Sequence, residues 1–121
     1  MRPIGHRLAA IVGERPKFGI DRFHPGATDD IAYAMTAQSD GKLVVAGRTG
    51  EYPQNDFAVA RYSSDGQLDQ TFGVGGKVVS DFSSIDQAYG IALQSNGRIV
   101  LAGISFNGAN FDFTVARYLG R

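Results

Sequence analysis

The chain has 121 residues, and its 12 basic and 12 acidic side chains leave no net charge. This balance offers no positive excess for nucleic acid or for an anionic membrane surface, so neither is expected as a partner. The absence of cysteine excludes disulfides, thiolate metal ligands and a cysteine nucleophile. Sixteen glycines and eight phenylalanines indicate short aromatic-rich strands joined by tight turns.

The N-terminal part differs in character from the rest of the chain. Residues 1–16 are predicted to form a flexible segment. Their apolar run Leu8–Val12 is shorter than the core of a secretory signal, which has about 7–15 residues. The sequence FGIDRF within residues 17–24 predicts a strand. No apolar run anywhere approaches the roughly 20 residues of a membrane-spanning helix.

The remainder of the chain contains two copies of one unit. Residues 30–62 and 86–118 align without a gap, and 15 of the 33 aligned positions are identical. In each copy Asp-Gly or Asn-Gly separates two apolar runs, which is a strong hairpin signal. In chain order, strands are predicted over residues 31–37, 42–49, 56–62, 77–82, 87–93, 98–105 and 111–118. A repeat of this length is typical of a propeller or another stacked array.

These patterns predict an all-β, propeller-type domain over residues 17–121. It would hold two four-stranded antiparallel blades, about residues 30–85 and 86–121, with residues 17–24 closing the last blade. Strands with apolar residues on both faces suit a sheet packed between neighbours. Two blades do not close a ring, so head-to-tail homo-oligomerisation is expected, with a trimer favoured over a tetramer. The alternatives are a fragment of a larger multi-repeat protein and a different β fold.

The motifs also carry a family resemblance. The segments AYAMTAQSDGKLVVAG, DFAVARYSSDGQLDQTFGVGGKVVSDF, AYGIALQSNGRIVLAG and DFTVARY resemble the delta-60 repeat family, a bacterial β-propeller repeat of undefined function. The resemblance covers about residues 30–118. Residues 1–29 depart from it, with His24, Pro25 and Gly26 where the family has a threonine- or aspartate-rich strand. The resemblance implies a propeller fold and supplies no catalytic residues to carry over to this sequence. It also implies a cell-surface or extracellular location, because family members are usually large, often surface-associated chains.

Four aspartates recur at the starts of predicted strands and are candidate metal ligands: Asp30, Asp56, Asp86 and Asp112. Alternate strands of a blade run in the same direction, so these carboxylates are expected at one end of the module. Carboxylates gathered there would bind a cation or hold sugar hydroxyls. The structural alternative is that each aspartate accepts backbone N–H groups in a turn.

Other candidates fall into two groups. The loops that differ between the copies are free to serve a ligand, and an aromatic ring beside amides suits a carbohydrate. The candidate ligand residues are Tyr52, Asn55, Phe106, Asn107 and Asn110. The invariant pairs are predicted to be structural, with each arginine pairing with a carboxylate between blades and packing on an aromatic ring. They are Arg61, Tyr62, Arg117 and Tyr118.

No catalytic signature stands out. The chain has only two histidines, and no G-x-S-x-G motif or metal-spaced histidine pair occurs. We therefore expect a non-catalytic binding or scaffold module that needs no cofactor. A lectin-like carbohydrate-binding propeller and a hydrolase that uses the aspartates are the alternatives.

Overall fold

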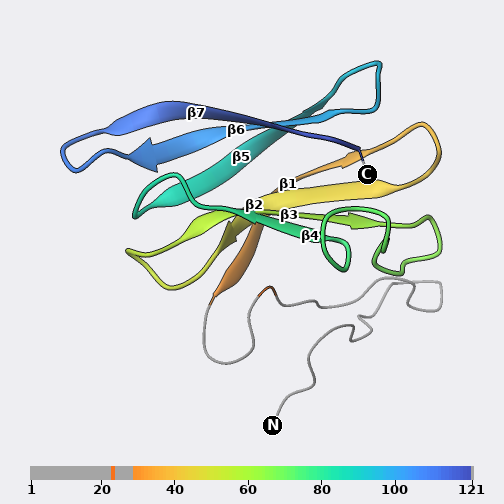
Figure 1. The fold of residues 1–121 in the computed structure, drawn as a ribbon, viewed down its shortest axis with the longest axis horizontal. Helices are drawn as coiled ribbons and strands as arrows, with labels where there is room; N and C mark the ends of the chain where they lie inside the picture. Colours follow the sequence, from red (N-terminus) through yellow and green to blue (C-terminus); the bar gives the residue numbers. More distant parts are fainter. Residues whose placement is uncertain (1–22, 24–28, 121) are drawn as a thin grey trace, which may run out of the picture.

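The computed structural model describes Phe23 and residues 29–120, which form two antiparallel sheets (Figure 1). The first sheet contains β1 (Asp30–Ala37), β2 (Leu43–Thr49), β3 (Asp56–Tyr62) and β4 (Lys77–Ser80), in that order. The second sheet contains β5 (Asp86–Leu93), β6 (Ile99–Phe106) and β7 (Phe111–Tyr118). In the described part of the chain, no helix has the length and apolar character needed to cross a membrane.

The predicted hairpins are confirmed. Gly41 and Gly97 close the β1–β2 and β5–β6 turns with positive φ angles of 89° and 84°, a backbone region that glycine enters without a steric penalty. The Gln38 and Gln94 amides donate to carbonyl oxygens across these turns, at 2.7 and 2.9 Å. The Asp-Gly and Asn-Gly signals in the sequence therefore mark the true strand connections.

Both sheets share an irregularity in the first strand. The register shifts between Ala32 and Ala34 in β1, and the same shift follows Ala88 in β5. Gly47 and Gly103 lie opposite these bulges, where a Cβ atom would collide with the backbone carbonyl of the neighbouring strand. The glycine is thus needed in both copies because the strands approach too closely for any side chain.

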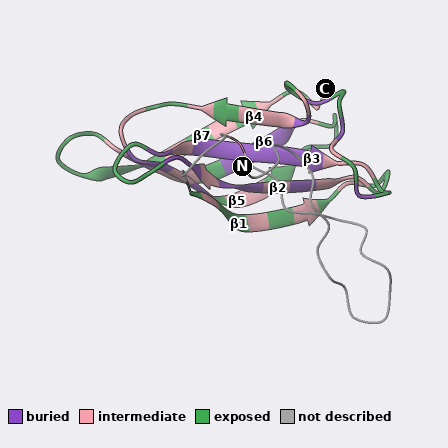
Figure 2. Cartoon of the chain, turned by 90° about the horizontal axis from the view of Figure 1, so that it is seen from below, coloured by how far each residue is buried: buried purple, intermediate pink, exposed green. Residues whose placement is uncertain are grey.

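The core lies between the two sheets. β5 packs against β1, β2 and β3, and the buried residues are largely apolar. The central cluster comprises Val44, Ala46, Phe57, Val59, Phe72, Ala88, Ile99 and Leu101. β3 is buried on both faces, as expected for a blade packed between neighbours, whereas much of β7 is exposed. Figure 2 shows the buried residues of β2 and β3 in purple.

Two predictions differ from the structure. The fourth strand ends at Ser80 rather than at Phe82, because the Phe82 amide turns to donate to Asp86 Oδ2 at 2.8 Å. The second sheet has three strands among the described residues, not four. The predicted closing strand (17–24) and flexible segment (1–16) lie outside those residues except for Phe23, which is in a bend.

Candidate functional site

The linker between the sheets is anchored at the start of β3. Asn55 is fully buried. Its backbone N–H donates to the Ser84 carbonyl at 3.0 Å, and its backbone carbonyl accepts from the Asp86 N–H at 2.8 Å. The Phe106 amide likewise donates to the Ile85 carbonyl at 3.0 Å. Asn55 was predicted to be a ligand residue in an open loop. The structure instead places it in a strap that joins the two sheets.

Two of the four repeated aspartates hold the chain where it enters a sheet. The Asp86 carboxylate accepts from the Phe82 and Ser83 amides at 2.8 and 3.1 Å and from the Ser83 hydroxyl at 2.9 Å. Asp30 accepts from the Phe23 amide at 3.1 Å and from the Thr49 hydroxyl. Both therefore make the turn contacts that aspartate favours.

The structure also brings three carboxylates together at this end of the module. One oxygen each of Asp56, Asp81 and Asp86 lies within 4.8 Å of the others. Sequence reasoning missed Asp81, which follows β4 and has no counterpart among the repeated aspartates. Asp30 lies outside this cluster, and so does Asp112, which accepts from the Asn107 side-chain amide at 3.0 Å. Because Asp86 already accepts three hydrogen bonds, its contacts are those of a structural turn.

Arg61 connects the two sheets through a buried guanidinium. Its exposed fraction is 2%, and its Nε donates to Asp69 Oδ2 at 2.8 Å. One terminal nitrogen donates to the Gly120 carbonyl at 2.7 Å, and the group lies 4.8 Å from the centre of the Phe72 ring. The carboxylate partner predicted for this arginine is present. It belongs to the same repeat, and the contact between repeats is made to a backbone carbonyl.

Asp69 supports this arginine and is itself unusually acidic. Burial alone would raise the pKa of its carboxyl, but hydrogen bonds from Thr71 and Lys42 and the charge of Arg61 outweigh it. The pKa is therefore held well below 3.8. The Lys42 ammonium lies 3.0 Å from Asp69 Oδ2. Sequence reasoning missed Asp69, although its place in the turn after the DFAVARY motif was visible.

The repeated tyrosines sit on the matching face of each sheet. The Tyr118 and Ser80 hydroxyls lie 2.8 Å apart, which joins β7 to β4. Burial of the Tyr118 phenol raises its pKa above 10.0, and the hydrogen bond with Ser80 acts in the opposite direction. Tyr62 occupies the equivalent position in the first sheet, where it lines an open hollow.

That hollow covers the open face of the first sheet, on the side away from the core. Its volume is about 620 Å³. The apolar side chains of this lining come from β1, β2 and β3. They include Ala32, Met35, Leu43, Val45, Ala58, Ala60 and Tyr62, with Phe23 beside them. Met35 is 66% exposed, so the β1 side of this face offers apolar surface to the solvent, whereas Ala58 and Ala60 of β3 are buried.

The outer face of the second sheet is also apolar and open. Phe113 is 98% exposed and Val115 is 67% exposed. They are cross-strand partners of Ile104 and Ala102 in β6. The next alternate residue of β7, Arg117, is also exposed. Neighbouring exposed apolar side chains of this kind are common at sites of contact between proteins.

The two open faces are related by the repeat to the two faces that pack together inside the chain. Residues 56 positions apart are equivalent, so Phe113 and Val115 correspond to the fully buried Phe57 and Val59. The open face of the first sheet corresponds to the inner face of the second. For example, Leu43 and Val45 of the open face correspond to Ile99 and Leu101 in the core. The seven strand residues named above for the hollow correspond, in order, to Ala88, Ile91, Ile99, Leu101, Thr114, Ala116 and Tyr118. Each open face thus resembles one half of an interface that the chain already forms.

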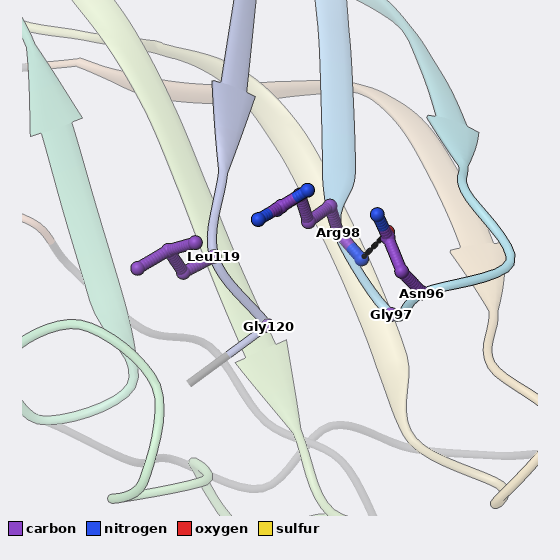
Figure 3. A pocket seen from close by; sticks show the side chains of 5 residues that line it. All are labelled: Asn96, Gly97, Arg98, Leu119 and Gly120. Carbon is purple, nitrogen blue, oxygen red and sulfur yellow. Dashed lines mark hydrogen bonds between the residues drawn. The ribbon is translucent and has the colours of Figure 1, made fainter.

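A smaller hollow of about 330 Å³ lies at the ends of β6 and β7, beside Arg98 and Leu119 (Figure 3). The Arg98 amide donates to Asn96 Oδ1 at 3.0 Å in the turn. Arg98 is the equivalent of Lys42. The part of the chain that the structure describes gives Arg98 no ion pair like that between Lys42 and Asp69.

The remaining predicted ligand residues lie in the β2–β3 and β6–β7 loops. Tyr52 is 69% exposed, and Asn110 is exposed as well. The Asn107 side chain is committed to its own turn, where Oδ1 accepts from the Ala109 and Asn110 amides. Phe106 is half-buried against Phe111, with ring centres 5.2 Å apart. Tyr52 and Asn110 are therefore the two that present a free surface to a ligand.

Comparison with known protein families agrees with this architecture. The family model described as "Domain of unknown function (DUF5122) beta-propeller" matches residues 38–72 and 94–120, about half of the chain. The chain belongs to this β-propeller family. The two matched segments begin at the β1–β2 and β5–β6 turns and each include the DFxVARY strand, so the match follows the repeat. Searches of curated proteins and of solved structures found no significant match.

Proposed function

We propose that this chain is a non-catalytic propeller module that associates head to tail with copies of itself to form a ring. The observation that carries the proposal is the repeat relation between its open and packed faces. The outer face of the second sheet carries Phe113 and Val115, the repeat equivalents of Phe57 and Val59, which are buried on the inner face of the first sheet. The open face of the first sheet carries the set able to receive them.

Association through two different faces is heterologous, and it ends only when the rotation between copies closes a ring. Propellers usually have about 4–8 blades, so three copies would give six blades and four copies eight. We favour the trimer. The resemblance of the motifs to delta-60 repeats is consistent with this, because proteins of that family usually contain many repeats in one chain.

Contacts at the inner edges of the sheets support a repeating arrangement. Tyr33 in β1 and Tyr89 in β5 are equivalent by the repeat, and their rings lie 4.7 Å apart. The residues therefore meet along the edge where successive sheets come together. In a ring, each copy would add another such pair, and the tyrosines would line the central axis.

Light scattering after size-exclusion chromatography tests the proposal. We expect the wild-type protein at three times 12.9 kDa. Phe113→Arg and Met35→Arg place a charge on opposite open faces, so each variant should be unable to form a ring. The control is Val74→Arg, at a residue that is 87% exposed and lies on neither face, and it should assemble as the wild type does.

Mixing the two defective variants gives the sharper result. Each retains one intact face, so a mixture should form a dimer with one copy of each variant and nothing larger. A wild-type protein that stays monomeric at all concentrations would contradict the proposal. So would Phe113→Arg assembling as fully as Val74→Arg.

Carbohydrate binding at the loops is a second proposal. Tyr52 and Asn110 are exposed in two loops at the same end of the module (Figure 1). A tyrosine ring stacks on a sugar while an amide binds its hydroxyls. A glycan array comparing wild type with Tyr52→Ala and Asn110→Ala tests this, and signals that persist in both variants would exclude these residues as the site.

A further inference from the structure

Each sheet has an edge strand whose bulge carries a tyrosine. β1 and β5 are edge strands of their sheets. The register of β1 with β2 skips Tyr33, and the register of β5 with β6 skips Tyr89, so each tyrosine is the extra residue of its bulge. A bulge re-aims the side chain of its extra residue. The same backbone feature therefore sets the direction of both tyrosines.

The two bulge tyrosines contact each other across the two sheets. Their ring centres lie 4.7 Å apart, with an angle of 47° between the ring planes. This separation is typical of directly packed aromatic rings. It is also close to the spacing of ring centres in a biphenyl, where a single C–C bond joins two rings. A covalent bond between these tyrosines would therefore need only a small movement of either side chain.

Both rings are open to solvent, and each hydroxyl has a polar neighbour. Tyr33 is 40% exposed and Tyr89 is 46% exposed. The Tyr33 hydroxyl accepts a hydrogen bond from Arg48 Nε at 3.3 Å, and the Tyr89 hydroxyl donates one to Gln87 Oε1. An oxidant can thus reach both rings. The phenol protons also have a route out, toward solvent from Tyr33 and toward the Gln87 amide from Tyr89.

The composition of the chain makes tyrosine its most easily oxidised aromatic residue. Tryptophan and cysteine compete most strongly with tyrosine for one-electron oxidants, and the chain contains neither. Without cysteine, no disulfide ties the first sheet to the second. A link between Tyr33 and Tyr89 would supply such a covalent tie.

We propose that Tyr33 and Tyr89 form an oxidative cross-linking site, where hydrogen peroxide and a peroxidase join the two rings as dityrosine. Each phenol loses one electron and one proton, and the two phenoxyl radicals form a C–C bond between the ring carbons next to their hydroxyl groups. The hydrogens on those carbons then leave as protons while the two oxygens are protonated again. Peroxide takes up the two electrons and two protons and becomes two molecules of water. The inference goes beyond the proposed function and holds for a single copy, because both tyrosines belong to the same chain.

Treatment of the whole chain with hydrogen peroxide and a haem peroxidase tests the proposal. We expect the blue fluorescence of dityrosine in a product that keeps the mass of one chain on a denaturing gel. Trypsin cleaves after lysine and arginine, so the link should join peptides 23–42 and 78–98, at the sum of their masses minus two hydrogen atoms. The proposal is wrong if dityrosine does not form, if this linked peptide is absent, or if it occurs only in bands larger than one chain.

Phenylalanine substitutions are matched variants, because they keep the ring and remove only the hydroxyl. Tyr33→Phe and Tyr89→Phe should each abolish the linked peptide. The control is Tyr52→Phe, at a tyrosine that is 69% exposed on the β2–β3 loop, and it should leave the yield unchanged. Dityrosine fluorescence as strong in Tyr33→Phe as in the wild type would show that the radicals couple elsewhere, which overturns the site.

The cross-link should also stabilise the module against unfolding. It joins residues 33 and 89 in different sheets, and a link that closes a long loop lowers the entropy of the unfolded chain. The urea midpoint of the linked wild type should therefore rise on treatment. Tyr33→Phe treated in the same way measures the effect of oxidation at other residues, such as the exposed Met35, and its midpoint should not rise. Equal changes in the two proteins would show that the link does not tie the sheets together.

Discussion

One pair of substitutions isolates the role of the open face with little ambiguity. Phe57 and Phe113 occupy the same motif position in the two repeats, and their exposed fractions are 0% and 98%. Phe57→Ala empties a fully buried site and should lower the free energy of unfolding by about 3–5 kcal/mol. In an isolated chain, Phe113→Ala removes almost no buried surface, so it should change that free energy by less than about 0.5 kcal/mol.

Protein concentration separates the two effects. Urea unfolding is measured from dilute samples, where copies are dissociated, to concentrated samples, where they associate. The loss for Phe57→Ala should be present throughout. The loss for Phe113→Ala should emerge only as association adds to the stability of the wild type. A loss of 3 kcal/mol for Phe113→Ala in dissociated protein would refute the reasoning, because it would mean that this ring is already buried within one chain.

Three further predictions concern contacts inside the module. Asp69→Asn should lower the free energy of unfolding above pH 4, and this loss should shrink in acid. The lowered pKa of the Asp69 carboxyl contributes stability that disappears as falling pH protonates it. Chemical unfolding between pH 2 and 7 measures the effect, and a loss that does not depend on pH would contradict it. Gly103→Ala should lower the free energy of unfolding by at least about 1 kcal/mol, because the new Cβ would collide with backbone atoms. The matched control is Gly90→Ala, where a Cβ meets nothing within 4 Å. Gly97→Ser is not a suitable control, because the φ angle of Gly97 is positive. Tyr118→Phe removes the hydrogen bond with Ser80 and should cost about 0.5–1.5 kcal/mol by thermal unfolding, and a neutral result would show that this bond adds nothing to the packing.

The local structure of this protein followed from its sequence because its signals are local. Asp-Gly and Asn-Gly turns separate the apolar runs, and the repeat allowed each copy to confirm the other. The seven strands lie where those signals predicted, with shifts of one or two residues at some of the ends. The fourth strand is shorter than predicted because Asp86, a residue outside that strand, takes the Phe82 amide.

The site residues were harder to predict because their roles depend on contacts across the chain. Asn55 looked like an open-loop residue, yet it is buried where the linker to β5 crosses it. Asp81 joins Asp56 and Asp86 only because the chain turns back between the sheets. Nothing in the local pattern around these residues carries information on such contacts.

The sequence by itself determined the strands, the turns and the twofold repetition, since these depend on residue spacing and on backbone preferences within a few residues. It also determined that equivalent residues exist in pairs. Only the tertiary structure decided that the two members of a pair can differ in burial, with Phe57 buried and Phe113 exposed. The reason is physical: burial depends on what packs against a side chain, and among residues 29–120 the first sheet has a neighbour on the face where the second sheet has none.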